Sequence, residues 1–76
     1  MNADDVKAVL IEGLPGCDVA VDYDGHDFNI SVVGDVFQGL RKVQRQQKVL
    51  GVLHQLITSG AIHAVNVNAI TPEEQG

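Results

Sequence analysis

Tryptophan is absent from this chain of 76 residues, and its aromatic side chains amount to two phenylalanines and one tyrosine. A chain of this length forms a single domain, and about 60% of its unfolded surface can be buried on folding. The core must therefore be small and mainly aliphatic. Because 45% of the residues are hydrophobic and 20% are charged, the composition is that of a folded protein rather than a disordered one. We predict one domain over residues 1–76, with residues 71–76 as a flexible tail.

Cysteine occurs only at Cys17, which excludes an internal disulfide and a cysteine-rich structural zinc site. We expect it to be a small buried hydrophobe at the start of a strand. Long apolar runs are also absent: the longest, such as Val9-Leu10-Ile11, are too short to cross a bilayer. Asp4 and Asp5 lie where a secretory signal would be basic. The sequence thus predicts a cytoplasmic protein that does not contact a membrane.

Basic residues are few and clustered. Five Lys and Arg side chains stand against ten Asp and Glu, for a net charge of −5. Four of the five fall within eight residues with no acid between them: Arg41, Lys42, Arg45 and Lys48. Such a helix face can meet phosphates or an acidic partner, and it can also be a solvated surface. Of these uses we predict the docking of a protein partner.

The N-terminal third changes from a helical period to a strand period. Over residues 2–14 the apolar positions recur at helical spacing after a possible N-cap asparagine, and Pro15-Gly16 ends the pattern. Over residues 17–23 apolar and polar positions alternate, which predicts a half-buried strand.

Asp24-Gly25 is typical of a two-residue hairpin loop leading into a second strand. This loop places Tyr23 opposite His26 and continues one apolar face across both strands. It also places Asp22 opposite Asp27, an unfavourable like-charge pair that favours a looser loop.

The remaining pattern predicts a short helical turn at 35–39, a helix over 40–59 and a third strand over 63–70. We expect Gly51 to allow close packing of the long helix against the sheet. The order of elements is helix, strand, strand, short helix, long helix, strand. This order predicts an α/β fold of the α+β sandwich type, with a three-stranded mixed sheet and the helices on one face. The connection into the last strand is long enough for a parallel crossover.

A parallel third strand has a chemical consequence. The second and third strands would then start at the same end of the sheet, so His63 would lie beside the hairpin loop that carries His26 and Asp27. Two imidazoles at one edge suit iron, zinc or copper. The sequence offers no further clustered ligands, so a partner or solvent would have to complete the coordination. His54, on the long helix, is expected to be an ordinary surface residue.

Three segments resemble the BolA-like family, and together they span nearly the whole chain. Residues 60–65 resemble its Ile-His-Ala-Leu signature, with Val65 in place of the leucine. Residues 36–40, followed by Val43 and Arg45, resemble its Phe-x-Gly motif and the next helix, and residues 71–74 match its end. A Gln46-Gln47 pair on the long helix is similar to the IbaG (YrbA) type of that family. The resemblance also implies a fold similar to a type II KH domain.

The resemblance implies a function as well. Family members pair with monothiol glutaredoxins, and the pair can hold a [2Fe-2S] cluster to which the signature histidine, here His63, is a ligand. A second ligand lies in the loop between the first two strands, usually just before the aromatic residue that opens the second. In this chain that position is Asp27, with His26 one residue earlier. His26 is the better candidate, because imidazole is the more usual ligand of iron in such clusters. We expect no cluster in the isolated chain, which would be a monomer or a weak homodimer.

Two other classes of function compete with this one. A KH-like regulator would use the basic helix to bind phosphates, but the net charge is negative and residues 34–39 lack the Gly-x-x-Gly spacing of RNA-binding KH domains. An enzyme would need a nucleophile near a base, and the expected topology places Cys17 at the far end of the sheet from both histidines. We therefore predict a non-enzymatic adaptor in iron–sulfur trafficking, iron homeostasis or the stress response, with weak nucleic-acid binding at most. The alternative is a KH-like, nucleic-acid-binding transcriptional regulator.

Overall fold

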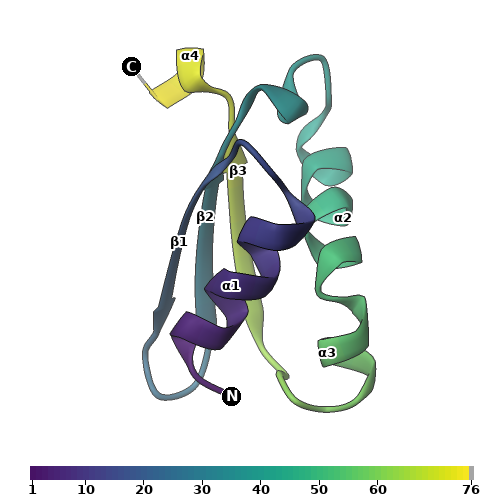
Figure 1. Ribbon diagram of the computed structural model, residues 1–76. Helices are drawn as coiled ribbons and strands as arrows, with labels where there is room; N and C mark the ends of the chain where they lie inside the picture. The colour runs from purple at the N-terminus through teal and green to yellow at the C-terminus, as the bar shows by residue number, and fades with distance from the viewer. Residues whose placement is uncertain (76) are drawn as a thin grey trace.

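The computed structural model describes residues 1–75 and places every helix of the main body on one side of the sheet (Figure 1). The elements in chain order are α1 (Ala3–Gly13), β1 (Asp18–Tyr23), β2 (Phe28–Val33), the 3₁₀ turn η1 (Asp35–Phe37), α2 (Lys42–Val52), α3 (His54–Thr58), β3 (Val65–Ile70) and α4 (Pro72–Gln75). The strand order is β1-β2-β3. β1 and β2 are antiparallel, and β2 and β3 are parallel. The predicted mixed sheet and its crossover are confirmed.

Helix α1 begins where the sequence predicts. The Asn2 side chain accepts a hydrogen bond from the Asp5 N–H at 2.9 Å, and the Asp5 carboxylate accepts one from the Asn2 N–H at 3.2 Å. This reciprocal pair satisfies two backbone donors that would otherwise have no partner in the helix. The face of α1 that carries Val6 and Leu10 is fully buried and covers the sheet next to β1 (Figure 1).

The hairpin loop is longer than the two residues predicted. β1 and β2 pair with Tyr23 opposite Phe28 and Asp22 opposite Asn29, so residues 24–27 form a four-residue loop. The register differs from the predicted one by two residues, which leaves every side chain on its expected face. The longer loop also removes the repulsion that a pairing of Asp22 with Asp27 would cause. The rings of Tyr23 and Phe28 stack at 4.6 Å between their centroids at the base of the loop.

The predicted long helix is interrupted at Leu53, which separates α2 from α3. The N–H of Leu53 bonds to the Leu50 carbonyl at 3.1 Å, a tighter turn than the α-helical one. The Leu53 side chain is completely buried, so core packing favours this local change of path. The expectation for Gly51 was wrong: the residue is exposed, and a methyl group built on it would contact nothing within 4 Å.

The core lies between the sheet and the helices. Its fully buried side chains come from the sheet and from the segments that cover it, and they are Val6, Leu10, Ile30, Val32, Phe37, Val49, Leu53 and Ile62. Half-buried residues of β1 and β3 pack around them. The other face of the sheet carries polar side chains such as Asn29, Ser31, Asn66 and Asn68, which agrees with one dry face and one wet face.

The tail, which the sequence predicts to be flexible, has a defined local structure over its described residues. Pro72–Gln75 forms the single turn α4, and Thr71 before it is buried. The Glu74 carboxylate accepts the Thr71 N–H at 2.8 Å and the Arg45 guanidinium at 2.6 Å. The Thr71 bond shapes the turn, and the Arg45 bond holds the tail against the first half of α2. Gly76, the last residue of the predicted tail, lies outside the described residues.

Candidate functional site

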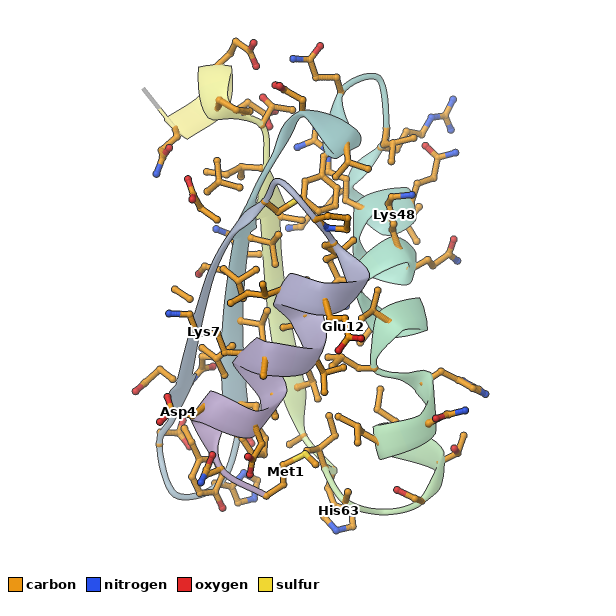
Figure 2. All side chains as sticks on the ribbon, viewed as in Figure 1. Met1, Asp4, Lys7, Glu12, Lys48 and His63 are labelled. Carbon is orange, nitrogen blue, oxygen red and sulfur yellow. The ribbon has the colours of Figure 1, made fainter. Side chains whose placement is uncertain are left out.

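The parallel pairing of β2 with β3 brings the two candidate histidines to the same end of the sheet. The Phe28 N–H donates to the Ala64 carbonyl at 2.9 Å, and His26 and His63 lie within two positions of the residues that this bond joins. Figure 2 shows His63 at the lower end of the molecule, on the connection from α3 to β3. The hairpin loop that carries His26 lies at that same end (Figure 1).

The hairpin loop is organised by the side chain of Asp24. Its Oδ1 accepts the backbone N–H of His26 at 2.9 Å and that of Asp27 at 2.7 Å. These two bonds lower the pKa of the Asp24 carboxyl below its ordinary value, and the bond from Asp27 has the larger effect. A charged Asp24 thus fixes the backbone of both candidate ligands of the loop.

His26 and Asp27 interact with each other. The Nδ1 atom of His26 is hydrogen-bonded to Oδ1 of Asp27, and this bond raises the pKa of the imidazole above its ordinary value. The other carboxylate oxygen of Asp27 accepts the amide of Asn66 at 3.1 Å, and the same amide donates to Asn29 at 2.9 Å. Asp27 therefore links the loop to β3, while the His26 side chain is 88% exposed.

His63 is exposed because its neighbour in the chain is buried. Ile62 is 1% accessible, and its N–H bonds to the Leu56 carbonyl at 3.2 Å. With Ile62 held in the core, the next side chain lies on the surface (Figure 2). Gly60 has a φ of 79°, a left-handed conformation that suits glycine and turns the chain from α3 toward β3.

The donor set at this end fits a shared metal centre. A histidine that binds a metal generally donates its other ring N–H to a carboxylate or carbonyl, and the bond from His26 Nδ1 to Asp27 has this form, leaving Nε2 for a metal. Over residues 1–75, no group of three or more His, Cys, Asp or Glu side chains is arranged to hold an ion. Two imidazoles alone would leave iron incompletely coordinated, so the remaining ligands would come from another molecule.

The segment that carries the predicted basic docking residues starts at the opposite end of the molecule. Arg41, Lys42 and Lys48 are exposed on or just before α2, whereas Arg45 is engaged inside the protein. Its Nε donates to the Leu40 carbonyl at 3.0 Å, and its Nη1 donates to the Ala69 carbonyl at 3.3 Å and to Glu74. The side chain of Arg45 is 15% exposed, so it braces α2, β3 and the tail.

The ion-pair partner of Arg45 is Glu74, which could not be identified from the sequence. Glu74 accepts from both Arg45 and Thr71, and the Arg45 bond is the main reason that the pKa of Glu74 falls to about 2. No local sequence signal connects residues 45 and 74. The same holds for the bonds of Asn66 to Asp27 and Asn29, which depend on strand pairing.

Cys17 lies just before β1, at the end of the sheet away from the histidines. Burial, followed by the nearby carboxylates of Asp18 and Asp35, raises the pKa of its thiol. A thiol in this state has little thiolate character at neutral pH. Neither His26 nor His63 is near enough to act as its base, in agreement with the predicted separation.

The sequence profile of the family described as BolA-like protein matches residues 16–74, which include the whole sheet and both histidines. The chain belongs to the BolA-like family. Over 74 residues, 97% of this chain and 88% of the relative, the BolA-like protein is 38% identical to the acid stress protein IbaG of Escherichia coli strain K12. The predicted subtype is thus supported by a relative as well as by the Gln46-Gln47 pair.

Solved structures of BolA proteins share the fold. A bolA protein homologue from Coxiella burnetii is 29% identical, with a TM-score of 0.87 over 99% of this chain and 96% of that one. The BolA domain of SufE1 from Arabidopsis thaliana is 26% identical, with a TM-score of 0.83 over 95% of this chain and 93% of that domain. As for membranes, none of the helices within residues 1–75 combines the length and the apolar character that a bilayer span requires.

Proposed function

We propose that this BolA-like protein is an adaptor that binds a monothiol glutaredoxin and co-ligates a [2Fe-2S] cluster with it. The observation that carries the proposal is the pairing of β2 with β3, marked by the bond from Phe28 to Ala64, which places His26 and His63 at one exposed end. The family resemblance supplies the class of partner and the type of cluster. The incomplete donor set explains why a second protein is needed.

Within this site His63 is the principal ligand and His26 the second one. Asp27 orients His26 rather than binding the metal, because one of its oxygens is bonded to His26 and the other to Asn66. Bound in this way, the cluster would supply electron transfer and a transferable iron–sulfur unit, and imidazole in place of thiolate would raise its reduction potential. The protein's own contribution is to hold two imidazoles on a fixed edge.

The biological setting follows from the relatives. The Escherichia coli relative carries the name acid stress protein, and we extend a stress-related role in iron–sulfur trafficking or iron homeostasis to this chain. The exposed basic residues Arg41, Lys42 and Lys48 would add charge-based docking at a distance from the ligands. The proposed adaptor role requires no catalytic residue. The single unpaired thiol of Cys17 suits the reducing cytoplasm.

The test is co-expression with a monothiol glutaredoxin, followed by size exclusion and by absorption and EPR spectroscopy of the complex. We expect a coloured heterodimer with features of mixed histidine and thiolate ligation. His63→Ala should abolish or alter the cluster, and His26→Ala should change its spectra less. Asp27→Ala should change the spectra in the same direction as His26→Ala, but by a smaller amount. His54→Ala removes an exposed histidine at the start of α3 and is the matched control.

Two results would contradict the proposal. The first is a complex whose spectra are unchanged by His63→Ala. The second is the absence of any cluster-bearing complex when both proteins are folded and present in excess iron and sulfide.

A further inference from the structure

The two outer strands of the sheet differ in how they are protected against pairing with another chain. β1 carries Asp18 and Asp22 within the strand, and charges on an edge strand oppose the addition of another strand. β3 has the sequence Val-Asn-Val-Asn-Ala-Ile, with no charge and no proline. The edge of β3 therefore lacks the charges and the proline by which many proteins prevent strand addition.

The backbone of β3 also has unused hydrogen-bonding groups. In a parallel pair, alternate residues of a strand direct their N–H and C=O toward the neighbour. The carbonyls of Ala64 and Ile70 accept from β2 and its extension, so the even-numbered residues face β2. The odd-numbered residues, Val65, Val67 and Ala69, face outward. Among residues 1–75, the one bond recorded to this outer edge runs from Arg45 to the Ala69 carbonyl.

A groove of about 330 Å³ lies along this edge. One wall is Leu40 with the first half of α2, and the other wall is residues 67–70, with Glu74 at the end. Arg45 and Glu74 neutralise each other through their ion pair. Lys42 is therefore the one lining charge, within residues 1–75, that has no opposite charge beside it.

We propose that this groove binds an extended, acidic segment of a partner protein, which adds to β3 as a fourth strand. A peptide in extended form presents N–H and C=O groups at the two-residue spacing that Val65 and Val67 offer. A carboxylate on the segment would pair with Lys42. This site lies away from the histidine end, and its test needs no bound cluster.

Nucleic acid is the competing occupant, and the groove suits it less well. Nucleic-acid affinity grows with the number of phosphates neutralised, and the lining supplies one uncompensated cation in a protein of net charge −5. The outward backbone groups, in contrast, match a peptide without any further charge.

The test begins with a phage-displayed library of linear octapeptides selected on the whole protein. We expect enrichment of peptides that alternate β-branched residues and carry Asp or Glu. Synthetic copies should shift the NMR signals of the Val65, Val67 and Ala69 amides and protect them from hydrogen exchange. Methylation of alternate peptide nitrogens should abolish binding, because it removes the donors that pair with the edge.

Two variants with the same change in charge distinguish binding in this groove from a general electrostatic effect on binding. Lys42→Glu should weaken binding about tenfold or more, because it places like charges together in the groove. Lys48→Glu should change binding less than about twofold, because Lys48 lies on α2 but lines a different surface with Cys17 and Val52. Val67→Pro removes one outward N–H while leaving the pairing with β2 intact, and it should also weaken binding, provided that thermal melting shows the fold retained.

The proposal is overturned if no octapeptide is enriched, if enriched peptides shift amides away from β3 and α2, or if Lys48→Glu weakens binding as much as Lys42→Glu. It is also overturned if a single-stranded oligothymidine binds the groove more tightly than every selected peptide.

Discussion

At the end of the sheet where His26 and His63 lie, the side chain of Asp24 holds the hairpin loop and both imidazoles stay exposed. At the opposite end, the strands run into the buried ring of Phe37 and into the ion pair of Arg45 with Glu74. Stability and candidate function are therefore divided between the two ends. The two exposed histidines can change with little effect on folding, whereas Phe37 and Arg45 at the opposite end contribute to packing.

The largest effect should come from Phe37→Ala at the packed end. The side chain is fully buried in the core, and truncation of a buried Phe typically costs about 3–5 kcal/mol. The free energy of unfolding, measured by urea denaturation, should fall by about that amount. A loss below about 1 kcal/mol would show that the packed end contributes less than its burial indicates.

Gly34→Ala should have an intermediate effect at the same end. Gly34 follows β2 in an extended conformation, so alanine fits its backbone, but the new methyl would overlap the Sγ of Cys17. Overpacking of this kind costs about 1–3 kcal/mol. Cys17→Ala should relieve most of the loss, and a double-mutant cycle of unfolding free energies measures this coupling. Purely additive losses would contradict the contact.

Glu74→Gln should have a smaller effect that depends on pH. The folded pKa of about 2 lies below the ordinary 4.5, so the charged form of Glu74 stabilises the fold fully above pH 4.5. That contribution is lost as the pH falls toward 2. Unfolding curves of both proteins between pH 6 and 2 should therefore converge at the acidic end. A constant difference across this range would exclude the Arg45 bond as its source.

His63→Ala should have the smallest effect on folding. The side chain is exposed, and surface substitutions of this kind usually change stability by less than about 0.5 kcal/mol. Its melting temperature should match that of the wild-type protein, while its cluster-binding complex is altered. If His63→Ala destabilised the protein as much as Gly34→Ala, the division between the two ends would be wrong.

The arrangement of the sheet could be predicted from the sequence because it follows from apolar periodicity and from the length of the crossover. These two features fixed the faces of all three strands and placed His26 and His63 at one end. The hairpin register could not be predicted in the same way. Asp24 accepts two backbone N–H groups of the loop and so stabilises a four-residue turn, which competes with the two-residue turn that Asp-Gly favours.

Other features depend on contacts between distant residues and left no local signal. The interruption of the long helix at Leu53 follows from the burial of that side chain in the core. Arg45 looked like a member of the basic surface, yet it is bonded to Glu74 and to two backbone carbonyls. In the same way, the bond from Asn66 to Asp27 requires the register of β3, which gives Asp27 its orienting position beside His26.

The histidines lie 37 residues apart in the sequence, and the pairing of β3 with β2, together with the bond from Asn66 to Asp27, keeps them at one end of the sheet. A local opening of β3 would therefore separate them even if α1 and the hairpin stayed folded. By linkage, a ligand bound to both imidazoles would favour the paired state by RT ln(1 + [L]/Kd). Loading and unloading of the site would then appear as a shift in the opening equilibrium of one strand, so the third strand would act as a reporter of occupancy to any protein that touches its outer edge.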